Sequence, residues 1–442
     1  MSKVAINLLW MAGLVLPAFG QFKNILLDSM ADKHGRFPIE PTVTINYKTP
    51  TTILVAAFPD HLYLTSDGGS TWKKTKSRSA FGVWDNPVLV SDFSGNMYYL
   101  HHSDPTGKNW ASDEILDRIV IKKSKDGGTT WDGGTSIGHN PPKDQFNAGA
   151  IADRKGNIFV AWTEMDNYGS ADEGCKSQVL FSKSSGGAKW SKPVVISKSG
   201  DCKDGDNTAR GAAPAVSGDG RLFIAWTHEG IIYLDRSFDG GTMWLSNDIA
   251  VTEQAGGSSF SVPGIQKING LPTLVCDNSK SLFNGALYLV WSEESMPNDT
   301  DIYFMRSLNY GDNWTQPLRI NDDEPGSYQF MPAMTVDHVS GHIYIVYYDR
   351  REYEDDQTDV YLAYSIDNGA TFKNVKISDK PFIPSADVPF GNKISIAANN
   401  GIIMPVWTRM DNGKTSLWTS IIKHEDLIGH KPEPKTGKKK KK

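Results

Sequence analysis

Short runs of alternating apolar and polar residues recur along the chain and predict β-strands in sets of four. The clearest set places strands near Ala213–Ser217, Leu222–Trp226 and Ile231–Arg236, and another from Trp244 onward. The same order fits residues 43–76, 88–137, 149–196, 274–320 and 333–377. Helical periodicity is nearly absent after the N-terminal segment. The pattern predicts an all-β chain made of repeated four-stranded antiparallel units.

A motif of the form Ser-x-Asp-x-Gly-x-Thr-Trp lies between the third and fourth strands of these units. Its fullest copy runs from Ser124 to Trp131. Further copies end at Trp72, Trp190, Trp244, Trp314 and Phe372. The spacing of about sixty residues is typical of a repeat architecture.

The motif has a structural interpretation as a hairpin turn. Its glycines supply the positive φ of a tight turn, and its carboxylate can accept backbone N–H bonds within that turn. The aromatic residue is then free to pack between neighbouring units. We therefore expect structural roles for Asp67, Asp126, Asp239, Asn309 and Asp367.

The motif resembles the Asp-box (BNR) repeat of sialidases and other secreted β-propellers, and the resemblance covers residues from about 22 to 422. It implies a β-propeller of four-stranded antiparallel blades with Asp-box turns. Six units carry a box, and a final three-strand set spans residues 393–422. We favour seven blades. Six blades are the alternative, because sialidases as a family have six.

The N-terminus is expected to complete the seventh blade. Phe22 to Leu27 repeats the order of Phe372 to Ile377, the strand after the sixth box, and the final set lacks such a strand. Pairing this strand with the chain around Leu417 would bury Ile25 and Leu27 and close the ring.

Three segments are expected along the chain. Residues 1–20 read as a signal peptide cleaved near Gly20, residues 21–424 as one β-propeller domain, and residues 425–442 as a disordered Lys-rich tail. The mature protein would be secreted or periplasmic, with no membrane span.

Three cysteines are present. Cys175 and Cys202 stand at the two open ends of one predicted hairpin, so we expect a disulfide between them, which an exported protein permits. Cys276 is expected to be a buried thiol. Without a Cys-x-x-Cys pair or a histidine partner, these cysteines do not indicate a zinc site.

The charge composition of the chain limits the classes of binding partner that we expect. The chain of 442 residues carries a net charge of −5, which gives no reason to expect nucleic acid. We expect a monomer with no cofactor and no metal. A calcium-dependent module is a third possibility, but no recognisable loop spacing supports it at Asp299, Asp301, Asp355 or Asp356.

Loops that gather at one end of a propeller, around its channel, are the expected ligand site. Acids, arginines and aromatics in these loops suit a sugar, because arginine forks bind carboxylates and paired carboxyl groups serve glycosidic bond cleavage. The candidate ligand-binding residues are Trp84, Asp85, Gln329 and Arg409.

The resemblance to sialidases implies a set of catalytic candidates. Gly35-Arg36-Phe37-Pro38 partly matches the family's first-arginine motif, so Arg36 is one candidate. Arg210 and Arg350 are candidates by position. Tyr353 is the proposed nucleophile, with Glu352 as its partner. The loop that should carry the family's acid is only Pro59-Asp60-His61, which is too short to reach a central substrate.

Two functions follow. The first is a glycan- or glycoprotein-binding propeller that lacks the full sialidase catalytic set; the missing acid and the seventh blade favour it. The alternative is an exo-sialidase-like glycoside hydrolase, which the charged loops support.

Overall fold

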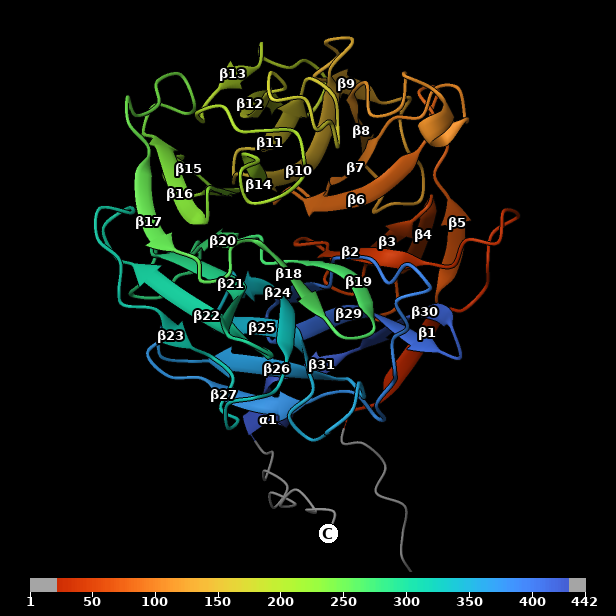
Figure 1. Cartoon of the computed structure of the whole chain (residues 1–442), viewed down its shortest axis with the longest axis vertical. Helices are drawn as coiled ribbons and strands as arrows, with labels where there is room; N and C mark the ends of the chain where they lie inside the picture. The colour runs from red at the N-terminus through yellow and green to blue at the C-terminus, as the bar shows by residue number, and fades with distance from the viewer. Residues whose placement is uncertain (1–21, 429–442) are drawn as a thin grey trace, which may run out of the picture.

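Residues 22–428 form a ring of seven β-sheet blades around a central axis in a computed structural model (Figure 1). The predicted signal peptide and the residues beyond 428 lie outside this described part. Within residues 22–428, no helix is both long enough and apolar enough to cross a membrane. The all-β seven-bladed fold predicted by the repeats is confirmed.

Six blades follow one another along the chain, each with its first strand innermost. Blades 1–3 comprise β2–β5 (Ile39–Ile45, Ile53–Phe58, His61–Thr65, Lys73–Lys76), β6–β9 (Trp84–Ser91, Met97–His102, Ile119–Ser124, Thr135–Ile137) and β10–β13 (Asp144–Ala152, Asn157–Met165, Ser177–Ser185, Val194–Val195). Blades 4–6 comprise β14–β17 (Arg210–Val216, Leu222–His228, Ile231–Ser237, Ile249–Glu253), β20–β23 (Thr273–Cys276, Leu287–Met296, Asp299–Ser307, Leu318–Arg319) and β24–β27 (Gln329–Val336, Ile343–Asp349, Asp359–Ser365, Lys373–Lys376).

The seventh blade joins the two ends of the described chain. It consists of β28 (Ser395–Asn399), β29 (Ile402–Asp411), β30 (Lys414–Ser420) and, from the N-terminus, β1 (Asn24–Asp28); the short β31 (Ile422–Lys423) also pairs with β29. β1 runs antiparallel to β30, so the predicted closure is confirmed. The expected burial differs: Ile25 and Leu27 are only partly buried, whereas Phe22 just before the strand is 6% exposed.

The Asp-box turns contain hydrogen bonds to the box carboxylate. Asp126 accepts hydrogen bonds from the Ser124 hydroxyl over 2.8 Å and from the backbone N–H of Thr130 over 2.8 Å. Hydrogen bonds from Thr130 and Ser124 lower the pKa of this carboxyl. In the fourth box, Gly241 has φ of 84° and lies so close to Phe181 of the preceding blade that a Cβ would come within 2.5 Å of it. The turns therefore lock neighbouring blades together.

The inner strands begin several residues earlier than the hydrophobic pattern indicated. A β-bulge interrupts the start of the first strand in five blades, between Ile39 and Thr42 in blade 1, for example. A residue with positive φ lies in each bulge: Glu40, Asn86, Asn147, Gly211 and Met331. Bulges re-aim side chains, so these residues form a repeated feature at the loop end of the inner strands.

A hairpin is inserted between blades 4 and 5. It consists of β18 (Ser259–Val262) and β19 (Ile265–Asn269), and it lies in front of the inner strands near the middle of the ring (Figure 1). Its buried face, with Phe260 and Ile268, packs in a cluster with Phe330 of blade 6. The hairpin thus covers part of the loop face.

A channel of about 250 Å³ follows the axis of the ring, lined by the inner strands of all seven blades. Its far end holds an aromatic cluster, in which the Tyr47 ring stacks on Phe93 at 4.8 Å and the Tyr47 hydroxyl shares a 2.8 Å hydrogen bond with His338. Burial lowers the pKa of His338 to about 4. The channel mouth at the other end is where the loops gather.

Two further features concern the sequence-based boundaries. The expected Cys175–Cys202 disulfide is present, with a Cα–Cα distance of 5.8 Å, and Cys276 is a buried thiol. The folded chain continues past residue 424 in the short helix α1 (His424–Ile428). Leu427 is 1% exposed and its carbonyl accepts a hydrogen bond from Tyr364, so this part of the expected tail packs on the propeller.

Candidate functional site

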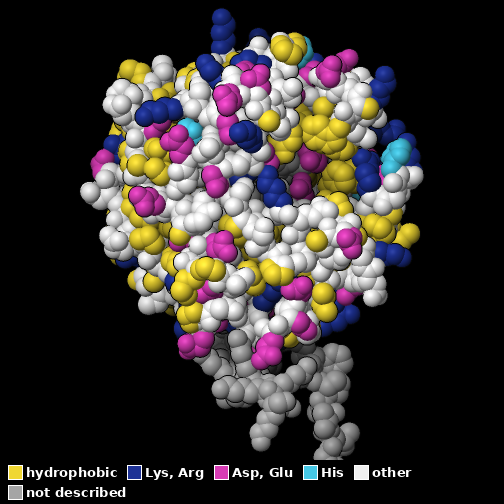
Figure 2. Space-filling view, in the orientation of Figure 1, with side chains coloured by type: hydrophobic (Ala, Val, Ile, Leu, Met, Phe, Trp, Pro, Cys, Tyr) yellow, Lys and Arg dark blue, Asp and Glu magenta, His cyan; other side chains and the backbone are white. Residues whose placement is uncertain are grey.

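A hollow opens on the loop face where β2 and β6 begin, at the mouth of the channel (Figure 2). Figure 2 shows acidic side chains inside it and hydrophobic side chains along its wall. The first and second blades are adjacent, and their inner strands β2 and β6 contact each other. We take this hollow as the candidate site.

Aromatic rings form a continuous wall beside the hollow. Phe58 meets Trp84 edge-on at 5.8 Å, Trp84 meets Trp110 edge-on at 6.3 Å, and Trp110 stacks on Tyr168 at 5.4 Å. Trp110 lies on the 3-10 turn η1 (Asn109–Ala111) and is 56% exposed. The guanidinium of Arg36 lies over both Phe58 and Trp84. Such rings offer flat faces to a ligand.

Polar side chains from three bulges face the same region. The amide of Asn86 donates to the Oδ1 of Asn147 over 3.1 Å. The carboxyl group of Glu40 accepts hydrogen bonds from the backbone N–H groups of Asn86 and Asn392. Gly391 packs against the Glu40 side chain, because a Cβ at that position would lie 2.9 Å from Cγ of Glu40.

Glu40 and Lys393 have pKa values that are shifted by burial and by neighbouring charges. Burial, reinforced by the nearby charge of Asp85, raises the pKa of Glu40 to about 7. Burial also lowers the pKa of Lys393 to about 8, against the attraction of Glu40 and Asp85. Lys393 Nζ donates to the Pro87 carbonyl over 2.7 Å, which fixes the amine between blades 7 and 2. Opposed shifts of this kind are frequent at functional sites.

A buried histidine contacts the carboxyl group of Asp85. Its Oδ1 lies 3.1 Å from Nδ1 of His102, and its side chain is 25% exposed. His102 itself is 1% exposed, and its Nε2 has no hydrogen-bond partner within the described residues. The carboxyl group of Asp85 is therefore oriented by the protein while one side stays open to solvent.

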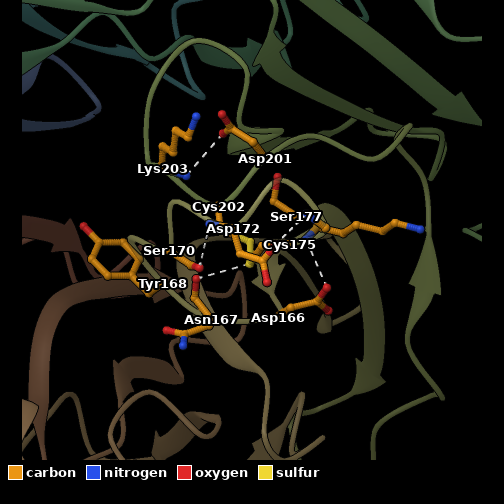
Figure 3. Close-up of a disulfide and its surroundings, with 12 residues drawn as sticks. Asp166, Asn167, Tyr168, Ser170, Asp172, Cys175, Ser177, Asp201, Cys202 and Lys203 are labelled. Atoms are coloured by element: carbon orange, nitrogen blue, oxygen red, sulfur yellow. Dashed lines mark hydrogen bonds between the residues drawn. A yellow bond between two sulfur atoms is a disulfide. The ribbon is translucent and has the colours of Figure 1, made fainter.

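Asp204 connects the aromatic wall to the inserted hairpin. Its carboxylate accepts hydrogen bonds from Tyr168 over 3.0 Å, from Arg210 over 2.8 Å and from Lys267 of β19 over 2.8 Å. Figure 3 shows Tyr168 on the loop beside the Cys175–Cys202 disulfide, with its ring pointing away from the sulfur atoms. The disulfide thus closes the loops that carry Tyr168 and Asp204.

The three arginines predicted as catalytic have separate partners. Arg36 is partly exposed, and its hydrogen bonds to Asp32 lower the pKa of that carboxyl to about 2 despite its burial. Arg210 is 1% exposed and donates to Ser258 and Ser259 as well as Asp204. Arg350 is 2% exposed and donates to the Pro263 carbonyl, Thr358 and Asp356. Two of the three therefore hold the inserted hairpin.

Tyr353 and Glu352 lie on the loop after β25. The Tyr353 hydroxyl donates to Asp359 over 2.7 Å, and burial together with Asp359 raises the pKa of the phenol. Glu352 is exposed. A nucleophile is helped by a lowered pKa, so this environment does not activate Tyr353. Its catalytic role, with that of Glu352, stays a prediction.

The four predicted ligand-binding residues divide into two pairs. Trp84 belongs to the aromatic wall, and Asp85 follows it in β6 with its carboxyl group beside His102. Gln329 is fully buried and bonded to Asp323 and Asn321, while Arg409 is 3% exposed and bonded to Asp411. Binding by Gln329 and Arg409 stays a prediction, since their polar atoms already have protein partners.

Sequence reasoning missed Glu40, Asn86, Asn147, Lys393, Trp110 and Tyr168. One signal was available: Trp84 and Trp110 occupy neither the box position nor the second-strand position taken by Trp162 and Trp226. A metal site is not among the geometries found. Within residues 22–428, no group of three or more His, Cys, Asp or Glu side chains is arranged to hold an ion.

Comparisons with known proteins bear on the fold. No protein-family model and no curated protein sequence matches this chain. The GH93 α-L-arabinofuranosidase of Fusarium graminearum, solved with arabinobiose, is similar with a TM-score of 0.50 and 12% identity, over 92% of this chain and 100% of that one. NanB with Optactamide is similar with a TM-score of 0.50 and 10% identity, over 86% of this chain and 84% of that one. The Hadza microbial sialidase Hz136 is similar with a TM-score of 0.49 and 12% identity, over 85% of this chain and 73% of that one.

The first two similarities agree with the blade topology. The chain is a seven-bladed β-propeller with a box turn between the third and fourth strands of six blades, as its repeats predicted. The identities are low, so the comparisons establish the fold and leave the chemistry to the residues of the hollow.

Proposed function

We propose that this protein binds a glycan, free or on a glycoprotein, in the hollow at the channel mouth. The observation that carries the proposal is the aromatic wall of Trp84, Trp110 and Tyr168 beside partly exposed polar groups. Aromatic faces pack on the C–H faces of sugar rings, and amide, carboxyl and amine groups hydrogen-bond their hydroxyls.

The site chemistry narrows the ligand class. Glu40, Asp85 and Lys393 place both signs of charge in the hollow, and Asn86 and Asn147 add donors and acceptors of hydrogen bonds. A ligand rich in hydroxyl groups fits this mixture better than a uniformly charged or apolar one. A propeller of similar fold holds arabinobiose, which supports the same class.

The exo-sialidase-like alternative has less support. It requires Arg36, Arg210 and Arg350 to share one carboxylate, yet Arg210 and Arg350 donate to the hairpin and are at most 2% exposed. A sialic acid carboxylate would have to displace these internal hydrogen bonds.

We also propose that the protein is exported and works as a monomer. The Cys175–Cys202 disulfide supports an oxidising compartment. N-terminal sequencing of protein from the culture medium or periplasm should begin at Gln21, and light scattering should give the mass of one chain. A mature N-terminus at Met1, or a dimeric mass, would contradict this part.

A glycan array followed by calorimetry with the best-bound oligosaccharide tests the main proposal. Trp110→Ala should weaken binding at least tenfold, because one stacking face is lost. Phe238→Ala is the control, since Phe238 is also exposed, at 55%, but lies on the Asp-box turn of blade 4. Equal binding by the wild type and Trp110→Ala, or no binding to any glycan, would refute the proposal.

A further inference from the structure

A basic side chain just before the box serine connects each of four blades to the next one. Each of these side chains donates a hydrogen bond to a backbone carbonyl in the box turn of the following blade. The pairs are Lys123 with Gly186 (3.1 Å), Lys183 with Gly240 (2.6 Å), Arg236 with Tyr310 (2.7 Å) and Arg306 with Asn368 (2.5 Å). The acceptor occupies the same position of the box in all four turns. This contact is therefore a repeated element of the interfaces from blade 2 to blade 6.

The interface between blades 6 and 7 has a different contact. Blade 7 carries no box, and the residue before the box serine of blade 6 is Tyr364. The Tyr364 hydroxyl donates to the carbonyl of Leu427 in α1 over 3.3 Å. The backbone N–H of His424, the first residue of α1, donates to the Gly401 carbonyl of blade 7 over 2.8 Å. The C-terminal helix therefore makes the contact that a box turn makes at the other interfaces, and it connects blade 6 to blade 7.

Two imidazole rings are in contact where α1 meets blade 6. The ring of His424 lies with its centroid 4.3 Å from that of His342, which immediately precedes β25. Nδ1 of His424 shares a 2.9 Å hydrogen bond with the Tyr344 hydroxyl. Like charges at this separation repel each other. Two protons, one on each imidazole, therefore oppose the docking of α1 on the propeller.

Asp337 is the buried acid beside this pair. It is 0% exposed, and its carboxylate accepts hydrogen bonds from the backbone N–H groups of Gly401 over 2.6 Å and Val339 over 2.8 Å. Its negative charge favours protonation of the imidazoles, but burial outweighs it and lowers the pKa of both His342 and His424. The charge that His342 can carry lowers the pKa of His424 further.

The other titratable groups around the pair do not supply a compensating charge. Lys423 and Glu425 are exposed and lie 3.7 Å from each other, and Asp426 is exposed in the first turn of α1. Burial raises the pKa of the Tyr344 and Tyr364 phenols, so both hydroxyl groups stay neutral at and below neutral pH. The two imidazoles are therefore the groups at this interface whose charge changes in mildly acidic solution.

We propose that α1 is a pH-dependent switch at the interface of blades 6 and 7, docked while His342 and His424 are neutral and detached when both are protonated. This inference goes beyond glycan binding and does not depend on it. Detachment would withdraw Leu427, which is 1% exposed, from the cluster that it shares with Ile403 and Ile422. Blades 6 and 7 would then lose the contact that replaces a box turn.

The direction of the pH effect follows from the environment of the two rings. Each imidazole has a pKa below its ordinary value of 6.5 in the docked state, so the detached state binds protons more tightly. Docking is therefore complete above pH 6.5 and weakens as the pH falls below that value. Local detachment of this kind leaves the rest of the fold intact.

Hydrogen exchange measured by mass spectrometry on the full-length mature protein, at about pH 7.5 and about pH 5, tests the switch. After correction for the intrinsic pH dependence of exchange, residues 421–428 should lose protection at least about tenfold at the acidic pH. Residues 222–237 of blade 4 should keep their protection, which distinguishes detachment from general unfolding. His338 stays neutral under these conditions, because burial lowers its pKa to about 4.

Variants assign the effect to the two rings. His342→Gln and His424→Gln each leave a single imidazole, so each should reduce the pH effect on residues 421–428 to less than about twofold. His139→Gln is the control, because the His139 side chain is 48% exposed and lies on the loop before β10. Tyr364→Phe removes the hydrogen bond to Leu427 and should lower protection at both pH values while leaving their ratio unchanged.

The outcomes decide the proposal in each case. Equal protection of residues 421–428 at both pH values in the wild type overturns the switch. A pH effect that persists in both glutamine variants, or an equal loss of protection in blade 4, also overturns it. A glutamine variant that is less protected at both pH values is still informative, because the ratio between them shows whether the pH effect remains. Unchanged protection in Tyr364→Phe overturns the role of α1 as the substitute for a box turn.

Discussion

Arg350 donates a hydrogen bond of 2.8 Å from Nη2 to the carbonyl oxygen of Pro263, which ties blade 6 to the turn of the inserted hairpin. On the other side, Arg210 of blade 4 donates to Ser259 at the start of the same hairpin over 2.7 Å. Two buried arginines, from blades that are not adjacent, thus donate hydrogen bonds to the same inserted hairpin. Their positions on the loop face made them catalytic candidates, but their contacts indicate anchoring.

Arg210→Met should destabilise the protein through the hairpin. Removing the guanidinium leaves Asp204 with only Lys267 and Tyr168 as side-chain partners and frees Ser258 and Ser259, at an expected cost of about 3 kcal/mol. The measurement is thermal unfolding combined with limited proteolysis, in which cleavage should concentrate within residues 259–269. Arg36→Met is the comparison, since Arg36 is partly exposed and should cost about 1 kcal/mol or less. An Arg210→Met protein with unchanged melting and proteolysis would contradict anchoring.

Loss of the disulfide should affect binding as well as stability. The bridge closes a segment with a sequence separation of 27, so the Cys175→Ser, Cys202→Ser double variant should lose about 3 kcal/mol of unfolding free energy. Because the bridged loops carry Tyr168 and Asp204, glycan affinity should fall too. Chemical denaturation and calorimetry measure the two effects. Cys276→Ala removes the remaining cysteine, in blade 5, and should leave glycan affinity unchanged. A similar loss of glycan affinity in both variants would contradict a specific effect of the bridged loops on the binding site.

The repeats made the architecture predictable because each blade restates the same physical requirements. A carboxylate in the turn, a glycine with positive φ and an aromatic residue recur together, so errors in one copy are corrected by the others. Phe22 to Leu27 could be recognised as a strand without a box because Phe372 to Ile377 provided a template. Cys175 and Cys202 could be paired because the hairpin brought their strands together.

The site was harder to predict because it lies where the alternation of apolar and polar residues stops. The bulges place Glu40, Asn86 and Asn147 within strands at positions where the hydrophobic pattern shows only loops. No repeated motif marks them, since the same position is Gly211 in blade 4 and Met331 in blade 6. Lys393 joins them only through ring closure, which places blade 7 beside blade 1.

The hairpin β18–β19 was missed for a related reason. It interrupts the repeat between blades 4 and 5, where no sister copy offers a comparison, and its strands are short. Arg210 and Arg350 both donate hydrogen bonds to this one insertion, so their side chains are not free to bind a ligand as expected. The charge of a residue and its position along a repeat therefore predict the part of a blade from which its side chain projects. The hydrogen-bond partners of that side chain depend on segments outside the repeat.

The raised pKa of Glu40 predicts a pH dependence of stability. Its pKa is about 7 in the folded state against an ordinary value of 4.5, so the folded state binds the proton more tightly. The resulting stabilisation is fully present below pH 4.5 and is lost as the pH rises through 7. The difference in unfolding free energy between the wild type and Glu40→Gln should therefore fall from pH 4.5 to 7. Urea denaturation at steps across this range measures it.

The control for the pH prediction is Glu114→Gln, whose difference from the wild type should stay flat over the same range because Glu114 is exposed. Measurements should stay below about pH 7.5, because Lys393 has a lowered pKa of about 8 and acts in the opposite sense. Its stabilisation is full above its ordinary value of 10.5 and is lost as the pH falls through 8. A wild-type curve parallel to that of Glu40→Gln would contradict the shift.

The ring closure rests on contacts that repeat those of an ordinary blade. Asn24 donates from its side chain to the Ile377 carbonyl over 2.8 Å, as Asn374 does to the Ile320 carbonyl over 2.9 Å. Asp28 at the other end of β1 is 5% exposed and accepts hydrogen bonds from Tyr63 and Lys74 of blade 1, both over 2.5 Å. β1 therefore connects blade 7 to both of its neighbours.

Deleting residues 22–29 should consequently weaken the whole ring. The loss of buried Phe22, of two half-buried aliphatic side chains and of the Asp28 contacts should cost about 4 kcal/mol. It would also expose the edge of β30 to pairing with other molecules. Calorimetry should show a melting point several degrees lower, and light scattering should show aggregation on heating. Phe22→Ala should reproduce part of the loss, whereas Leu26→Ser, at a side chain that is 46% exposed, should change little. A shortened protein that melts and stays monomeric like the wild type would show that β1 does not seal the ring.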